Sequence, residues 1–204
     1  MAEVSAADVK GLRERTGAGI MDCKAALAEA EGDMDRAIEI LRVKGQASAA
    51  KRSGKDTSEG LVASYIHATG TVGVLVEVQC ETDFVARSDE FRGFADEVAI
   101  HIAGAPSPPA YVSADEITEE ARAAERRVFT EKAKEEGKPD AIVEKIVEGQ
   151  LSKWAKDVAL LEQEHIRTDR HEGKSIEELR AEIASKTGEN VRIARFAHFR
   201  VGEE

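Results

Sequence analysis

Apolar residues recur at helical spacing along the first 45 residues, and polar or turn-forming residues separate them into three groups. Ser5 and Asp8 have the spacing of a capping box in front of the first group. The second group covers about residues 20–30, and Asp33 can cap a helix over the third. The pattern predicts three short helices whose inner faces carry Val9, Leu12, Met21, Ala25, Leu27, Ala28, Met34, Ala37, Ile38 and Leu41.

Four later segments have the composition of β-strands. Leu61–His67 and Val72–Val78 flank the turn sequence Ala68–Thr71 and predict an antiparallel hairpin. Asn190–Val201 alternates strictly and predicts a long final strand, and Asp157–Gln163 is a further candidate because it is rich in aliphatic residues. Because strands and helices come in mixed order around a local hairpin, we predict an α+β fold, an antiparallel three-stranded sheet with packed helices.

Helical patterns fill most of the chain between the predicted hairpin and the final strand. Residues 89–103 have helical periodicity at Phe91, Phe94, Val98 and Ile102. Residues 113–156 are rich in charge, and Gly137-Lys138-Pro139 interrupts them, which predicts two antiparallel helices joined by a tight turn. Ser113 and Glu116 match a capping box at the start of this charged hairpin.

The charge balance changes near residue 55 and indicates a boundary there. Residues 1–55 carry ten basic and nine acidic residues, a net charge of +1, whereas the rest of the chain carries a net charge of −12. Residues 46–59 are small, polar and basic, as is typical of a linker. Three helices in 45 residues bury little apolar area, so we expect the first segment to function by contacting something else.

The overall composition narrows the classes of function. The net charge is −11 and aromatic residues make up 4% of the chain, so the average surface repels a nucleic-acid backbone and offers little base stacking. No run of 18 apolar residues is present, and Glu3, Asp8 and Lys10 rule out an apolar leader at the start. Two cysteines fit a reducing compartment. We therefore expect a soluble cytoplasmic protein that binds neither nucleic acid nor membrane.

Patterns for nucleotide and metal binding are incomplete. Gly173-Lys174-Ser175 has the sequence that ends a phosphate loop, but Thr168 stands where the leading glycine belongs. His165 and His171 lie among acidic residues without a metal-ligand spacing, which favours a polar surface loop. We expect no metal and no cofactor.

The two cysteines are the remaining candidates for covalent chemistry. Neither Cys23 nor Cys80 has a histidine beside it in the sequence, and a thiol nucleophile needs a base. A small hydrolase or transferase that uses one of them with His101 is the enzyme alternative. We instead expect both cysteines to be small buried hydrophobic residues and the protein not to be an enzyme.

Thr82-Asp83-Phe84 lies where the predicted hairpin ends and the next helix begins. An aromatic residue at such a junction, between an acid and Val85, is placed to project from the surface. The same spacing also fits a Phe84 in the core and an Asp83 that caps the following helix, and spacing alone favours this second interpretation.

Several motifs follow one another in a fixed order along the chain. Leu12–Lys24 and Glu81–Ala86 are the two longest. Gly137-Lys138-Pro139 is followed by Ile146–Gly149, and Gly188-Glu189-Asn190 precedes the last strand. Together they cover essentially the whole chain, which resembles the bacterial translation elongation factor Ts family, in the short form with a single core subdomain.

This resemblance implies a guanine-nucleotide exchange factor that binds elongation factor Tu and promotes GDP release. Phe84 is implied to insert between helices of the partner, while Asp83 perturbs the polar network that holds its magnesium ion. The residues implied to dislocate the magnesium ion are Thr82, Asp83, Phe84 and Val85. The N-terminal residues implied to bind the partner are Leu12, Arg13, Thr16, Gly17, Ala18, Gly19, Ile20 and Met21.

The resemblance also implies a domain organisation and an oligomeric state. Residues 1–45 correspond to a ubiquitin-associated-like three-helix domain, 46–59 to a linker, and 60–204 to an α+β core and dimerisation domain that includes the helical hairpin 113–156. The short form is expected to be a homodimer, and since no cysteine lies in the last strand, the dimer would depend on packing. The alternative function is a helical adaptor that binds through residues 1–45 without exchange activity.

Overall fold

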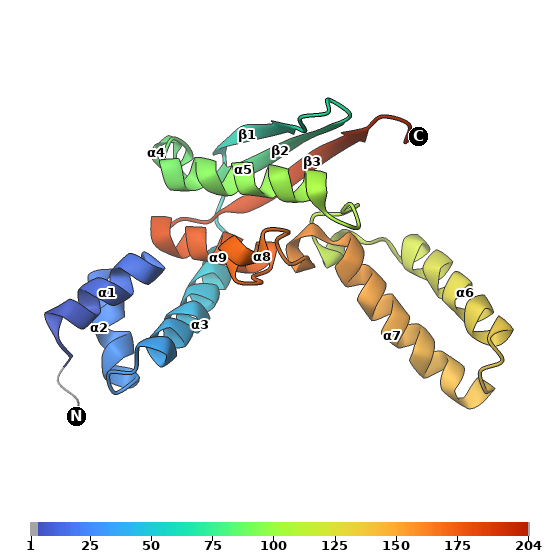
Figure 1. Ribbon diagram of the computed structural model, residues 1–204, viewed down its shortest axis with the longest axis horizontal. Helices are drawn as coiled ribbons and strands as arrows, with labels where there is room; N and C mark the ends of the chain where they lie inside the picture. Colours follow the sequence, from blue (N-terminus) through green and yellow to red (C-terminus); the bar gives the residue numbers. More distant parts are fainter. Residues whose placement is uncertain (1–3, 204) are drawn as a thin grey trace. The chain divides into compact units, whose positions relative to one another are not determined.

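A three-stranded antiparallel sheet forms the β part of the fold. The computed structural model describes residues 4–203 (Figure 1). The strands, hydrogen-bonded in the order β1-β2-β3, are β1 (Glu59–Ile66), β2 (Val72–Cys80) and β3 (Arg192–Arg200). The amide of Val201, after β3, donates to the carbonyl of Thr71, before β2, at 2.9 Å, as an antiparallel pair requires. The predicted hairpin, final strand and α+β class are confirmed.

Three helices precede the sheet, and the predicted capping residues start two of them. They are α1 (Ala6–Thr16), α2 (Ile20–Glu29) and α3 (Met34–Arg52). The Asp8 amide donates to Ser5 Oγ at 3.1 Å and the Ser5 amide donates to the Asp8 carboxylate at 3.3 Å, which is the predicted capping box. Asp33 Oδ1 accepts from two amides in the first turn of α3. α3 ends at Arg52, so helix covers the first part of the segment predicted as a linker.

The inner faces of these helices differ in part from the prediction. The buried cluster consists of Leu12, Cys23, Ala26, Leu27, Ala30 and Ala37. Met21 is 74% exposed, and Ala25 and Ala28 are exposed too, so their predicted inward orientation is wrong. With 3.6 residues per turn, positions 23, 26, 27 and 30 share one face of α2, and that face is the one that packs.

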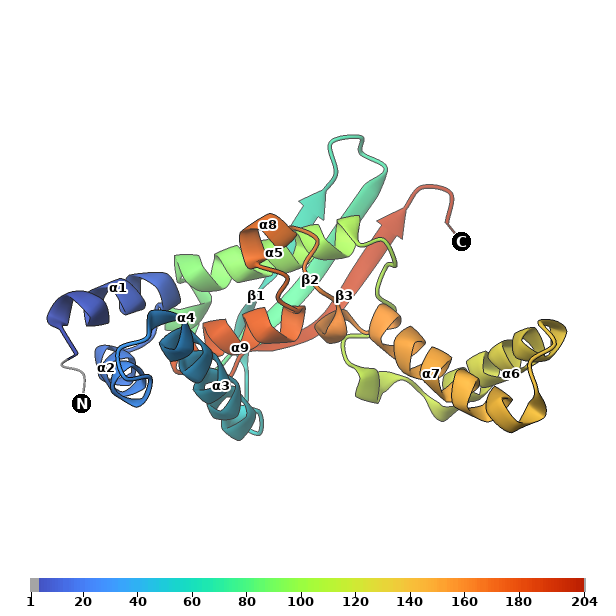
Figure 2. The same cartoon turned by 60° about the horizontal axis from the view of Figure 1, so that its bottom comes forward.

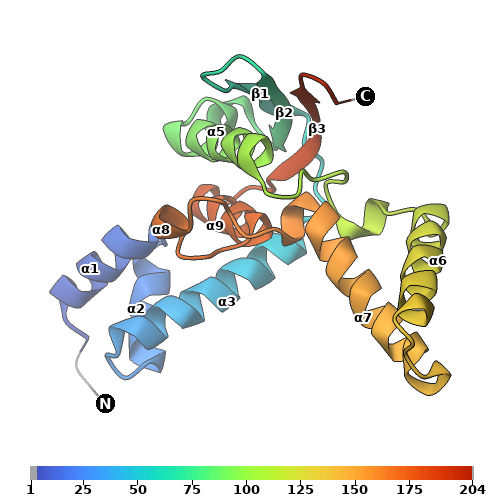
Figure 3. The same cartoon turned by 45° about the vertical axis from the view of Figure 1, so that its right-hand side comes forward.

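The remaining helical segments lie between β2 and β3 in the sequence. They are α4 (Asp83–Ala86), α5 (Asp89–Gly104), the 3₁₀ turn η1 (Ala114–Glu116), α6 (Glu119–Glu135), α7 (Asp140–Val158), the 3₁₀ turn η2 (Leu160–Glu162), α8 (Thr168–His171) and α9 (Ile176–Thr187). α5 lies along the sheet (Figures 1 and 3). Its predicted apolar positions are buried, namely Phe91, Phe94, Val98 and Ile102. Among the helices of residues 4–203, none has the length and apolar character that a bilayer crossing requires.

The strand predicted over Asp157–Gln163 is wrong. α7 continues to Val158, and η2 follows after one residue. The Leu160 amide donates to the Tyr111 carbonyl at 2.9 Å, which leaves only an isolated bridge where a strand was expected. A short aliphatic run fits a helix end as well as it fits a strand, so its composition did not distinguish the two.

The helix cap predicted at Ser113 is also wrong. Its side chain makes no capping hydrogen bond, and the Glu116 carboxylate accepts instead from the Val112 amide at 2.9 Å. Thr118 caps α6, and its hydroxyl accepts from the Ala121 amide at 3.2 Å. The helix therefore starts five residues later than the pattern indicated.

α6 and α7 form the predicted charged helical hairpin (Figures 2 and 3). Its apolar seam consists of Ala133, Val143, Val147 and Leu151, flanked by Phe129 and Trp154. Arg126 and Glu148 form an ion pair across the two helices. The hairpin thus has a core of its own beneath its charged surface.

Contacts along the chain define two compact units. The first comprises the chain up to Ala63 with Glu77–Ala95 and Glu178–Ile193. The second comprises Ser64–Val76, Asp96–Glu177 and the chain from Ala194. The division of the chain into 1–45, 46–59 and 60–204 stays a prediction.

Candidate functional site

Phe84 is held at the surface by a short turn that buries its neighbour. Thr82 is the N-cap of α4, and its hydroxyl accepts from the Val85 amide at 3.4 Å. Phe84 is 83% exposed, whereas Val85 is buried. The Asp83 carboxylate does not cap the helix and forms an ion pair with Arg87 at 3.0 Å. The interpretation with Phe84 in the core and Asp83 as the cap is therefore wrong, and the ring projects into solvent.

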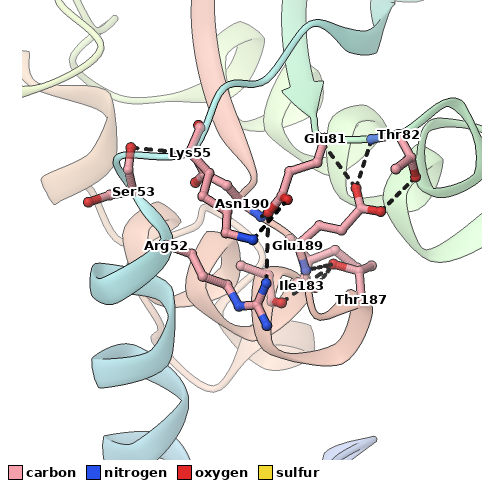
Figure 4. Close-up of polar contacts among 10 residues, drawn as sticks. Arg52, Ser53, Lys55, Glu81, Thr82, Ile183, Thr187, Glu189 and Asn190 are labelled. Carbon is pink, nitrogen blue, oxygen red and sulfur yellow. Dashed lines mark hydrogen bonds and ion pairs between the residues drawn. The ribbon is translucent and has the colours of Figure 1, made fainter.

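The carboxylate of Glu189 holds the two residues in front of α4 (Figure 4). Its Oε2 accepts from the backbone amides of Glu81 and Thr82, both at 3.0 Å, and its Oε1 accepts from the Thr82 hydroxyl at 2.6 Å. Glu189 follows Gly188, whose φ of +72° ends α9 in a conformation that glycine adopts without strain. An ionised acceptor makes all three of these hydrogen bonds stronger than bonds between neutral groups.

A second contact joins the same two segments in the opposite direction, from the Asn190 backbone to the Glu81 side chain. The Asn190 amide donates to Glu81 Oε1 at 2.6 Å, and this bond, followed by the charges of Lys55 and Arg52, lowers the pKa of Glu81 although desolvation opposes it. The buried Asn190 side chain donates through Nδ2 to the carbonyls of Lys55 at 2.8 Å and Ser53 at 3.4 Å. We call this set the Glu81 network; its members are Glu81, Thr82, Glu189 and Asn190.

The two cysteines have the environment of inert thiols. Cys80 is buried, and its Sγ donates to the Thr82 carbonyl at 3.2 Å. Burial first, and the charge of Glu189 second, raise the pKa of the Cys80 thiol to about 11. Cys23 is buried too and donates to the Ala18 carbonyl at 3.7 Å. These contacts give the enzyme alternative no support.

An open groove of about 670 Å³ brings together residues from the two predicted binding sets. Arg13 and Gly17 come from the N-terminal set, and Phe84 and Val85 come from the turn. Glu189 also lines this groove. A groove with an exposed ring at its wall is a surface that can receive a helix or loop of another protein.

The N-terminal set is divided between interior and surface. Five members pack in the cluster or fix the backbone between α1 and α2, namely Leu12, Thr16, Gly17, Ala18 and Gly19. Ile20 and Met21 are 57% and 74% exposed, and neither lines the Phe84 groove. Ile20 instead lines a second groove of about 380 Å³ together with Val9 and Arg13. Arg13 is thus the one member of this set that lines both of these grooves.

A polar cluster in the second unit corrects the prediction for His165. This ring is fully buried rather than part of a polar surface loop. Its Nε2 donates to the Glu97 carbonyl at 3.0 Å, and its Nδ1 accepts from the Arg167 amide at 3.1 Å. The Glu97 carboxylate forms ion pairs with Arg167 at 3.0 Å and Arg170 at 2.6 Å and lies 3.4 Å from His171 Nε2.

Hydrogen bonding within this cluster disfavours a metal ion. Ligand atoms of Glu97, His165 and His171 lie within 4.8 Å of one another, the one such group of three or more in the described part of the chain. Because Nδ1 of His165 accepts from a backbone amide, the proton of the neutral ring is on Nε2, the atom that would have to bind the metal. The Glu97 carboxylate is already paired with two arginines. The cluster therefore fits an internal ion-pair network.

Buried histidines in this unit predict a loss of stability in acid. His101 bonds through Nε2 to Gln163 Oε1 at 2.9 Å and accepts through Nδ1 from the Ile166 amide at 3.2 Å. Burial lowers the pKa of His101 to about 4 and also lowers that of His165, whereas an unfolded chain takes up these protons near 6.5. The free energy of unfolding should fall as pH drops from about 6.5 to about 4, with up to about 3 kcal/mol from His101. Urea unfolding across this range measures it.

A pair of histidine variants tests whether His101 causes the loss of stability in acid. His101→Gln removes a titrating ring, so its stability should depend less on pH between about 6.5 and 4. His67→Gln, at an exposed position, is the matched control and should keep the wild-type slope. Equal slopes for His101→Gln and the wild type would contradict the assignment to His101.

The fold and the site together define an α+β protein that presents an exposed aromatic ring beside a groove, as proteins that bind other proteins do. Comparisons with known proteins identify the family. The family model described as elongation factor TS matches residues 48–172. The elongation factor Ts of Desulforamulus reducens is 50% identical over 203 residues, which are 100% of this chain and 91% of that protein.

Two further relatives match over nearly their whole length. The elongation factor Ts of Caldanaerobacter subterraneus subsp. tengcongensis is 50% identical over 98% of both chains. That of Solidesulfovibrio magneticus is 49% identical over 204 residues, the whole of both chains. The chain belongs to the elongation factor Ts family and is a translation elongation factor.

Proposed function

We propose that this protein is a guanine-nucleotide exchange factor that binds elongation factor Tu with GDP and promotes GDP release. The observation that carries the proposal is Phe84, an apolar ring 83% exposed at the start of a helix and next to a groove that α1 also lines. The exposed ring offers apolar area that another protein can bury. Membership of the elongation factor Ts family supports this function.

In this mechanism the turn acts on the partner's nucleotide pocket. Phe84 inserts between helices of the nucleotide domain, and Asp83, whose side chain is 60% exposed, perturbs the polar groups that hold the magnesium ion. Loss of magnesium leaves the phosphate charges of GDP less compensated, so GDP leaves faster. Thr82 and Val85 position the two residues between them.

The N-terminal helices supply binding energy that offsets the distortion of the pocket. Exposed Arg13, Ile20 and Met21 offer one cation and two apolar side chains to the nucleotide domain of the partner. The predicted members Leu12, Thr16, Gly17, Ala18 and Gly19 act by shaping this surface. Because the coupling is reciprocal, GDP must weaken binding of this protein as much as this protein weakens binding of GDP.

The proposed reaction needs no covalent chemistry from this chain. Exchange changes the affinity of the partner for a ligand, so it requires neither a catalytic residue nor a cofactor. A net charge of −11 disfavours nucleic acid as a partner. We place the function in the cytoplasm, where elongation takes place, without a membrane partner.

We further propose that the protein is a homodimer that packs through its sheet. Four large apolar side chains around one groove are exposed on neighbouring strands and after β3, and three of these four exceed 60% exposure. They line an open apolar groove of about 390 Å³ and include Ile66, Leu75, Phe199 and Val201. A second copy presents the same surface, so one two-fold contact covers both patches.

A charge on this surface is expected to separate the proposed dimer. Phe199→Asp places a carboxylate in the apolar contact, where it loses its hydration without gaining a partner. Sedimentation at micromolar concentration should show a dimer for the wild type and a monomer for this variant. Val128→Asp, at an exposed apolar position on α6, is the control and should stay dimeric. A wild type that is strictly monomeric and still exchanges nucleotide would refute the dimer.

The experiment that tests the function mixes this protein with elongation factor Tu that carries labelled GDP. An exchange factor raises the rate of GDP release in proportion to the complex formed, up to a maximum. A helical adaptor that binds through residues 1–45 forms the complex and leaves the release rate unchanged. Complex formation and release rate, measured together, therefore distinguish the two functions.

A further inference from the structure

We infer that Glu189 is a positioning residue for nucleotide exchange, because its carboxylate fixes the backbone that carries Phe84 (Figure 4). The inference rests on the proposed exchange function and adds a residue to which neither spacing nor the implied binding set assigns a role. Glu189 is separated by more than 100 positions in sequence from the turn that it holds. It acts through Phe84 and has no chemical role of its own.

Phe84 needs support from outside its own helix. α4 has four residues, too few for a helix to hold its conformation by internal hydrogen bonds. Glu189 provides the support by accepting three hydrogen bonds from Glu81 and Thr82, directly in front of the helix. Cys80 adds a fourth contact, from its Sγ to the Thr82 carbonyl at 3.2 Å.

The Glu81 network also ties this turn to the end of α3. The Glu81 carboxylate accepts from the Asn190 amide, and the Asn190 side chain donates to the carbonyls of Ser53 and Lys55. Ser53 directly follows α3, the last of the N-terminal helices, and Lys55 lies two residues further on. The backbone of the turn and the end of α3 are thus anchored on two consecutive residues, Glu189 and Asn190.

Stiffness of the turn matters for the proposed mechanism. When a side chain inserts into another protein, the more flexible of the two contacting segments changes its conformation. If the turn of Phe84 were mobile, binding energy would be lost in ordering it and would not distort the nucleotide pocket. A preorganised turn directs that energy to the partner. We therefore expect loss of Glu189 to lower the maximal rate of GDP release more than the affinity for the partner.

The test compares Glu189→Ala with Glu189→Gln in the full chain. Alanine leaves the Glu81 and Thr82 amides without their acceptor, and the maximal release rate should fall about tenfold. Glutamine keeps one carbonyl oxygen that can accept from the backbone amides of Glu81 and Thr82. Its side-chain NH2 can donate to the Thr82 hydroxyl, so this variant should restore most of the rate. Glu164→Gln, at an exposed carboxylate of the second unit, is the charge control and should match the wild type.

A double-mutant cycle with Phe84→Ala separates positioning from general stability. If Glu189 acts through the ring, Glu189→Ala should change the rate little once Phe84 is absent. A tenfold loss in both backgrounds, or a wild-type rate for folded Glu189→Ala, would overturn the inference. Thermal unfolding of each variant shows that the chain is folded.

Hydrogen exchange of the Thr82 amide distinguishes failure of this inference from failure of the proposed function. If wild-type protein does not accelerate GDP release, the exchange function itself is wrong. The amide should lose protection in Glu189→Ala, whatever the partner does. An amide that stays protected in this variant would show that Glu189 does not hold the turn.

Discussion

Replacing Phe84 with alanine is expected to lower the maximal rate of GDP release from elongation factor Tu roughly a hundredfold. The ring is 83% exposed in the free chain, so its apolar area is available to the partner. Burying a phenylalanine side chain contributes roughly 1.5–3 kcal/mol, and each 1.4 kcal/mol changes a rate or equilibrium about tenfold. Stopped-flow measurement of labelled GDP at saturating factor gives the rate.

The same exposure makes this variant a clean test. Because the ring contacts little of its own chain, Phe84→Ala should unfold at nearly the wild-type temperature. Phe84→Leu keeps an apolar side chain and should give an intermediate rate. Wild-type release by a folded Phe84→Ala variant would remove the proposed role of the ring.

Replacing Leu27 with alanine is expected to unfold the N-terminal helices locally. Their buried cluster contains two large aliphatic side chains, Leu12 and Leu27, and its other members are cysteine or alanine. A buried leucine truncated to alanine costs about 2–5 kcal/mol, which a three-helix segment can hardly supply. Hydrogen exchange of α1 and α2 should become fast, and affinity for the partner should fall with it.

Val43→Ala is the matched control for this loss of helix packing. Val43 lies on α3 and is 59% exposed, so its truncation removes an apolar side chain without opening a cavity. Exchange in α1 and α2 should stay at the wild-type level in this variant. Unchanged protection in Leu27→Ala would show that the cluster is not what holds these helices.

Local patterns predicted the elements of this fold better than their faces and ends. Alternation predicted β3, and capping residues such as Ser5 and Asp33 predicted helix starts, because each depends on neighbours in sequence. The inner face of α2 was misassigned because its alanines are compatible with more than one apolar face of the helix. Cys23 and Ala26 are on the buried face because that face packs against the other helices. Tertiary contacts made that choice.

At the site too, the sequence predicted what depends on neighbouring residues and missed what depends on contacts between distant segments. The residues of the turn were predicted, yet whether Phe84 projects or packs depends on the burial of Val85, which spacing did not reveal. Glu189 and Asn190 occurred only in a motif of the resemblance, because their partners are more than 100 positions away in sequence. His165 was placed at the surface because its burial depends on a helix far from it in the chain.

Calorimetric titration of this protein against elongation factor Tu, once with GDP bound and once without nucleotide, tests the proposed coupling most directly. If the protein promotes GDP release, reciprocity requires tighter binding to the nucleotide-free partner, by about a hundredfold or more. Equal affinity for the two forms would contradict an exchange function, whatever the structure of the complex.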